Sequence, residues 1–95
     1  MEGKKVIVNM LDLSTGNISE ATAAEIRDEF FEPYGLVSYE TPYGFFVCCD
    51  NEIELEKLPK DLREAIIYAK MHDCSWLHFD RDAEYIKDLR AYKWD

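Results

Sequence analysis

Two amphipathic helical segments alternate with short apolar segments along this chain, and that order limits the fold more than any other feature. Apolar residues recur at helical spacing over residues 20–32 and again over 60–72. Four other segments have the short apolar pattern of strands: 5–10, 37–40, 43–49 and 76–80. The order predicts an α+β fold of the ferredoxin-like type, β-α-β-β-α-β, with two helices on one face of an antiparallel sheet.

Capping and turn residues support these boundaries. Ser19 can cap the first helix, but Thr22 with Glu25 has the spacing of a capping box, so the sequence leaves two starts open. Pro33 with Gly35 should end the helix. The sequence Thr41-Pro42-Tyr43-Gly44 suits a tight turn, so the two middle strands should form a hairpin. The pattern of residues 50–57 fits a strand, a loop or a short helix equally well.

Length and composition limit the class of protein further. With 95 residues, of which 47% are hydrophobic, the chain should form a single α+β domain over residues 1–95. It contains no apolar run long enough to cross a membrane. The three cysteines, two of them adjacent, make a poor disulfide framework and suggest the reducing cytoplasm.

Charge is the most unusual global property. Twenty acidic residues against 11 basic ones give a net charge of −9. Nucleic acid and anionic lipid would both be repelled, so neither is an expected partner. A basic protein surface is the natural complement, although acidity can also serve only solubility.

The acidic residues fall into two rows with regular spacing. On the expected first helix, four of them occupy one stripe at i, i+3, i+4 and i+7: Glu25, Asp28, Glu29 and Glu32. In an extended chain, four alternating acids would lie on one side: Asp50, Glu52, Glu54 and Glu56. Two such rows could imitate the phosphates of a nucleic acid, so these eight residues are the candidate partner-binding site.

A second acidic group follows the last expected strand, where Asp80, Asp82 and Glu84 alternate. Asp-x-Asp after an apolar strand resembles the nucleophile motif of haloacid-dehalogenase-type phosphatases. That motif closes the first strand of a large sheet, whereas only residues 81–95 follow here. Aspartate is common in turns because its side chain bonds the nearby backbone, so we expect an acidic turn.

Metal and nucleophile chemistry have weaker support. The possible ligands do not have the spacing of a structural zinc site: Cys48, Cys49, His72, Cys74 and His78. A Cys–His catalytic pair would also lack a glycine-rich oxyanion or phosphate loop. We therefore expect no cofactor, no bound metal and no enzymatic activity. A small metal-binding protein or enzyme is the least favoured alternative.

Four stretches together resemble a known family. They are Leu13-Ser14-Thr15-Gly16-x-Ile18, Leu58-Pro59-x-Asp61-Leu62, Trp76-Leu77-x-Phe79-Asp80-Arg81-Asp82 and Leu89-x-x-Tyr92-x-Trp94. With these, the chain resembles a family of small uncharacterised acidic bacterial proteins from plasmids, conjugative elements and phages. Members of that family often accompany antirestriction genes. The resemblance implies a mobile-element setting in a bacterial host cell and supplies no catalytic residues.

Two hypotheses about function follow. The first is an inhibitor of anti-CRISPR or antirestriction type, which occupies the basic groove of a host nuclease or CRISPR effector. The alternative is a non-catalytic interaction or accessory domain that binds through exposed aromatic residues. The candidates for that role are Tyr34, Tyr39, Tyr43, Tyr92 and Trp94.

Overall fold

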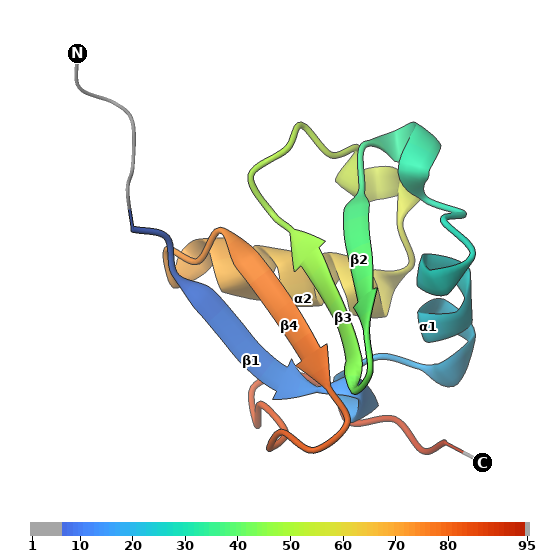
Figure 1. The fold of residues 1–95 in the computed structure, drawn as a ribbon, viewed down its shortest axis with the longest axis vertical. Coiled ribbons are helices and arrows are strands. Elements are labelled where there is room, and N and C mark those ends of the chain that lie inside the picture. The colour runs from blue at the N-terminus through green and yellow to red at the C-terminus, as the bar shows by residue number, and fades with distance from the viewer. Residues whose placement is uncertain (1–6, 95) are drawn as a thin grey trace.

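The computed structural model of the chain describes residues 7–94 and contains the predicted order of elements (Figure 1). The strands are β1 (Met10–Ser14), β2 (Val37–Thr41), β3 (Gly44–Cys48) and β4 (Trp76–Asp80). The helices are α1 (Glu20–Arg27) and α2 (Lys60–Met71). Residues 7–94 also contain three short 3-10 turns: Thr15–Asn17, Glu32–Tyr34 and Leu55–Lys57. The β-α-β-β-α-β order is therefore confirmed.

The sheet is mixed, which corrects the prediction of a wholly antiparallel one. Its strand order is β1-β4-β3-β2, and β1 runs parallel to β4 while the other neighbours are antiparallel. Leu11 lies opposite Leu77, and Leu13 opposite Phe79. This pairing aligns the apolar residues of both strands on the face that the helices cover. Only the β2–β3 hairpin is specified by a local turn, so the sequence could not show the position of β1.

The first strand begins later than predicted. Of the predicted segment 5–10, residues 5–6 lie outside the described part, and Ile7 and Val8 are 79% and 51% exposed. The strand instead has the alternation Leu11-Asp12-Leu13, with Leu13 fully buried. Alternation of apolar and polar residues suits a sheet with one covered face. This alternation is a better predictor of the strand than the run of β-branched residues that precedes it.

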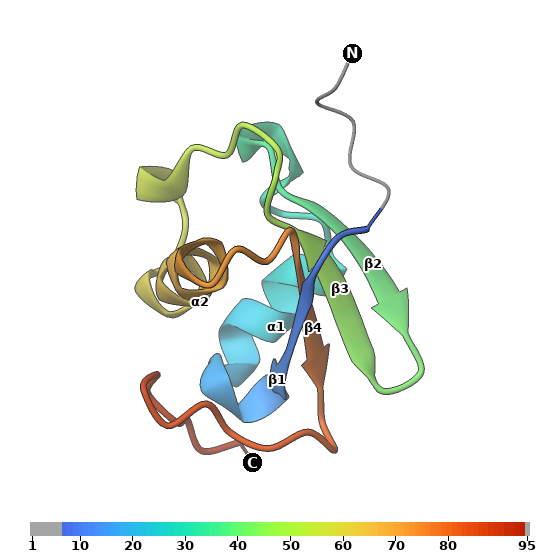
Figure 2. The ribbon, with the colours of Figure 1, turned by 90° about the vertical axis from the view of Figure 1, so that its left-hand side faces the viewer.

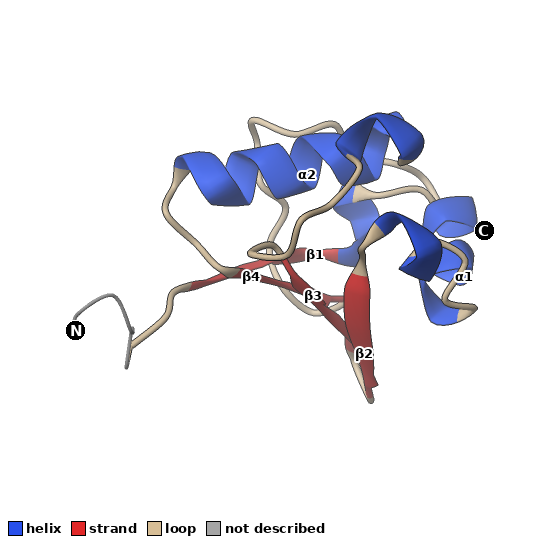
Figure 3. Ribbon diagram, turned by 90° about the horizontal axis from the view of Figure 1, so that it is seen from above, coloured by secondary structure: helices blue, strands red, loops and turns tan. Residues whose placement is uncertain are grey.

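Both helices cover the same face of the sheet, and the core lies between the two layers (Figure 3). The helix α2 buries the stripe predicted for it, Leu62, Ala65, Ile66 and Ala69, and none of the four is exposed. The sheet contributes Leu13, Phe45, Val47, Leu77 and Phe79. Among residues 7–94, neither helix has the length and apolar character that a membrane crossing would require.

A buried carboxylate joins the beginnings of the two helices. Asp61, in the first turn of α2, accepts hydrogen bonds from the Ser19 backbone N–H at 2.7 Å and the Thr22 hydroxyl at 3.0 Å. It also accepts one from the Leu62 N–H at 2.9 Å. Ser19, one of the two starts that the sequence left open, is the N-cap of α1, and its hydroxyl accepts the Thr22 N–H. Asp61 therefore fixes where α1 starts relative to α2.

The C-terminal segment packs on the turn that follows β1 (Figure 2). The buried Asn17 side chain accepts the Ile86 N–H at 2.8 Å and donates to the Arg90 carbonyl at 3.1 Å. Further along, the Trp94 indole N–H donates to the Ile18 carbonyl at 3.0 Å. Two of the stretches that carry the family resemblance, at the front and the end of the chain, therefore contact each other.

Replacing Asp61 by alanine should lower the free energy of unfolding by about 2–4 kcal/mol. The change leaves the Ser19 N–H and the Thr22 hydroxyl buried without their acceptor. Asp50→Ala is the matched control because Asp50 is exposed, and it should change stability by at most about 0.5 kcal/mol. Equilibrium urea unfolding measures both values. Equal stability of the two variants would contradict the capping role.

Candidate functional site

The acidic stripe predicted for the first helix does not form on one helix. The helix α1 ends at Arg27, and Glu29 has a left-handed backbone with φ of 58°. The predicted helix to residue 32, and with it a single stripe through Glu25, Asp28, Glu29 and Glu32, is therefore wrong. The physical reason is packing, because the early end of the helix buries Phe31 and leaves Phe30 59% exposed.

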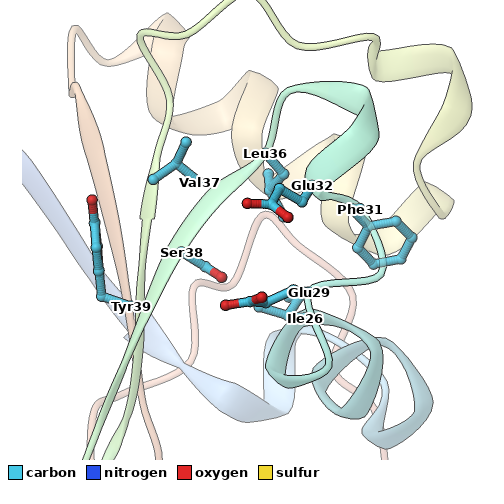
Figure 4. Close-up of a pocket in the computed structure, with 8 residues that line it drawn as sticks. All are labelled: Ile26, Glu29, Phe31, Glu32, Leu36, Val37, Ser38 and Tyr39. Atoms are coloured by element: carbon cyan, nitrogen blue, oxygen red, sulfur yellow. The ribbon is translucent and has the colours of Figure 1, made fainter.

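Two of these acids nevertheless meet at a shallow pocket between α1 and β2. Ile26, Phe31, Leu36 and Val37 contribute to its walls. Figure 4 shows the carboxylates of Glu29 and Glu32 pointing into the same opening as the Ser38 hydroxyl. Asp28, Glu29 and Glu32 are exposed, whereas Glu25 is half-buried on α1. The left-handed turn thus collects three of the four acids beyond the end of the helix.

The second acidic row is exposed, and it lies in a loop. Residues 50–54 have no regular structure, and the 3-10 turn Leu55–Lys57 follows them. Ile53 and Leu55 pack against the core. The acids that alternate with them are all exposed: Asp50, Glu52, Glu54 and Glu56. The segment that the sequence left open is therefore a loop with one apolar side and one acidic side.

Backbone contacts bring the two acidic segments side by side. The Glu54 N–H donates to the Tyr34 carbonyl at 2.9 Å, and the Asn51 side-chain amide lies 3.5 Å from the Gly35 carbonyl. Gly35 has a φ of 94°, and a Cβ there would come within 2.3 Å of the Glu52 carbonyl oxygen. Only glycine permits this close approach. We call segments 28–35 and 50–57 together the acidic end, which lies at the top of Figure 1.

Among residues 7–94, no Lys, Arg or His side chain forms an ion pair with the carboxylates of the acidic end. The ion pairs among residues 7–94 are Arg27–Glu40, Lys60–Glu64 and His78–Asp12. None of them uses one of the eight predicted partner-binding acids, and no hydrogen bond within the described part reaches their carboxylates. This charge is therefore available to a basic partner.

The Asp-x-Asp stretch forms a turn, as predicted. The Asp80 carboxylate accepts the Asp82 N–H at 2.8 Å, and the Ala83 N–H donates to the Asp80 carbonyl at 3.0 Å. Asp82 and Glu84 are exposed. Within residues 7–94, no group of three or more His, Cys, Asp or Glu side chains is placed to hold a metal ion.

Cys49 and His78 do not lie together in the fold. Cys49 is fully buried, and burial raises the pKa of its thiol to about 12, with the neighbouring Cys48 adding to the shift. A thiol with that pKa stays protonated at neutral pH and is a poor nucleophile. His78 lies on the uncovered face of the sheet, where its Nδ1 is 2.8 Å from an Asp12 carboxylate oxygen.

The aromatic residues named from the sequence do not share one surface. Tyr34 and Trp94 pack against the core, while Tyr39 and Tyr43 are 58% and 52% exposed. Tyr92 is half-buried. The sequence reasoning missed Phe46 and Trp76, which line the uncovered sheet face with Tyr39 and Met10. Their alternation with the buried residues of β3 and β4 is the signal that could have placed them there.

Taken together, the fold and these surfaces define a small α+β domain with an exposed acidic end and an uncovered, aromatic sheet face. The chain belongs to the family described as "Family of unknown function (DUF5983) C-terminal domain", whose model matches residues 10–94. The match confirms the expected membership of an uncharacterised family. No curated protein and no solved structure matches the chain.

Asp80 and Asp82 should differ in their effect on stability. Only the Asp80 carboxylate accepts a backbone N–H within the described turn, so Asp80→Ala should cost about 0.5–2 kcal/mol of unfolding free energy. Asp82→Ala should change it by at most about 0.5 kcal/mol. Thermal or urea unfolding of the two variants measures the difference. A larger loss for Asp82→Ala would show that the turn is built differently.

Glycine at position 29 should stabilise the protein by about 0.5–1 kcal/mol. A left-handed residue with a Cβ costs about 1–2 kcal/mol, and the greater flexibility of unfolded glycine offsets part of the gain. The neighbouring Asp28 has a φ of −84°, so Asp28→Gly should be neutral or destabilising. Urea unfolding of both variants tests the assignment, which fails if Glu29→Gly is the less stable of the two.

Proposed function

We propose that this protein is a non-catalytic inhibitor that binds the basic, nucleic-acid-binding surface of another protein through its acidic end. The observation that carries the proposal is the hydrogen bond from the Glu54 N–H to the Tyr34 carbonyl, at 2.9 Å. It joins two exposed acidic segments that are distant in the sequence. Solubility alone would be served equally well by acids spread over the whole surface.

Binding by the acidic end depends on the number of its carboxylates and on their ordered backbone rather than on any single residue. An exposed charge pair contributes only about 0.2–1 kcal/mol, so several carboxylates must act together. At the acidic end they are attached to segments whose apolar residues, such as Phe31, Ile53 and Leu55, pack in or on the core. Charges on an ordered backbone lose less conformational entropy on binding than charges on a disordered tail.

The expected partner is a nuclease or CRISPR effector in the bacterial cytoplasm, and the inhibition is of anti-CRISPR or antirestriction type. A groove that accepts nucleic acid carries many Lys and Arg side chains, which the acidic end complements. The resemblance to proteins of plasmids, conjugative elements and phages supports this choice. In such a setting, an inhibitor of a host defence complex would protect the incoming DNA.

Removing four charges from the acidic end should weaken binding by about tenfold or more. The test is capture of basic proteins from a nucleic-acid-free bacterial lysate on immobilised protein. The variant changes Glu29, Glu32, Glu52 and Glu54 to Gln. A control variant with the same loss of charge changes Asp73, Asp82 and Asp88 to Asn and Glu84 to Gln, all exposed elsewhere. Only the first variant should lose its partner, and added DNA should elute the partner from the wild-type protein.

Salt supplies a second readout of the same proposal. Capture by the wild-type protein should fall steeply between about 0.05 and 0.5 M salt, because exposed charges more than a Debye length apart are then screened. Equal capture by both variants, or a captured protein that DNA does not displace, would contradict binding by the acidic end to a nucleic-acid groove.

A further inference from the structure

Within residues 7–94, nothing covers the face of the sheet opposite the helices, and this face is apolar over part of its area. Both helices lie on the other side (Figure 3), and Figure 1 looks onto the open face. Four side chains from four strands form a shallow apolar depression on it, which we call the aromatic face: Met10, Tyr39, Phe46 and Trp76. Met10 and Tyr39 are 47% and 58% exposed. Because this surface contributes nothing to the core, its apolar side chains are available to a partner.

The rings of this face are held in place by their neighbours. Tyr39 and Trp76 have ring centroids 6.2 Å apart, and Phe46 stacks on His78 at 4.5 Å. The contact of His78 with the carboxylate of Asp12, at 2.8 Å, fixes the imidazole in turn. Rigid aromatic side chains lose little conformational entropy on binding, which is why they are common anchors at interfaces.

Two carboxylates of the open face, those of Asp12 and Asp80, lie next to the rings. Asp12 lies two residues after Met10, on the same face of the sheet, and its side chain is 68% exposed. The following pair on this face, Ser14 and Asp80, adds a second carboxylate. The open face thus has an apolar part and, beside it, an acidic part. A ligand that matches both must carry an apolar group with a positive charge nearby.

We infer that the aromatic face binds a short protein segment in which an apolar side chain stands next to Lys or Arg. Charge complementarity selects this occupant: Asp12 and Asp80 would repel the phosphates of a nucleic acid, although bases could stack on the rings. A second copy of this chain would bring the same carboxylates and another net charge of −9 to the interface. The inference does not depend on the function proposed for the acidic end.

Two peptides separate the aromatic face from the acidic end. One alternates Leu and Arg over six residues, and the other has Ser in place of each Leu, so their charges are equal. We expect the Leu-Arg peptide to bind about tenfold tighter or more, because only it buries apolar surface on the rings. In amide NMR spectra, it alone should shift Tyr39, Phe46 and Trp76. Shifts confined to Glu32 and Glu54 with both peptides would indicate the acidic end alone and overturn the inference.

Variants test the same surface without changing its charge. Tyr39→Thr and the double variant Tyr39→Thr/Phe46→Thr keep strand-forming residues, and each should reduce the preference for the Leu-Arg peptide, the double variant to nearly none. The control is Phe30→Thr, because Phe30 is an equally exposed ring outside the sheet, at 59%. It should bind like wild type. The single variant, at the more exposed position, keeps the test valid if the double variant does not fold.

Three results would overturn the inference. The first is unchanged peptide preference in a folded Tyr39→Thr/Phe46→Thr variant. The second is tighter binding of single-stranded oligothymidylate than of the Leu-Arg peptide at Tyr39 and Trp76, which would assign the face to nucleic acid. The third is a concentration-dependent dimer in sedimentation that the same double variant abolishes, since the face would then be a contact between two copies.

Discussion

The arrangement of the whole molecule depends on the buried carboxylate of Asp61. It accepts hydrogen bonds from the N-cap residue of α1 and from Thr22, although it belongs to the first turn of α2. A buried carboxyl group that accepts three hydrogen bonds aligns its neighbours more strictly than apolar contacts do, since unmade hydrogen bonds in the interior are costly. The two helices therefore have one relative position on the sheet. The segments that leave them, including the acidic end, are positioned as a consequence.

The residues that carry the family resemblance are explained by this architecture rather than by chemistry. Asp61 holds the helices together, the Gly16 carbonyl accepts the Tyr92 N–H of the C-terminal segment at 2.7 Å, and Asp80 forms a turn after β4. Trp94 donates to the Ile18 carbonyl, which joins the front and closing stretches. These stretches build the scaffold. The acidic end lies elsewhere, whereas Trp76 and Asp80 of these stretches also belong to the uncovered face of the sheet.

Local patterns predicted part of this structure well. The apolar stripe of α2, the β2–β3 hairpin and the acidic turn at Asp80 follow from spacing within a few residues. The place of β1 beside β4 could not be predicted, because it depends on contacts between residues more than 60 positions apart. The end of α1 was also missed, since Glu29 adopts a left-handed backbone to bury Phe31. The sequence shows which residues are acidic. It could not show that the two acidic segments lie side by side, because this too depends on contacts between distant residues.

The central claim is that two acidic segments form one ordered surface, and amide hydrogen exchange of Glu54 tests it most directly. In this account the Glu54 N–H is bonded to the Tyr34 carbonyl at 2.9 Å. Its exchange, measured by NMR on the full chain, should be slower than the rate for an unfolded peptide by about 100-fold or more. Exchange of Glu54 at the unprotected rate, while the core amides of β4 stay protected, would contradict the claim.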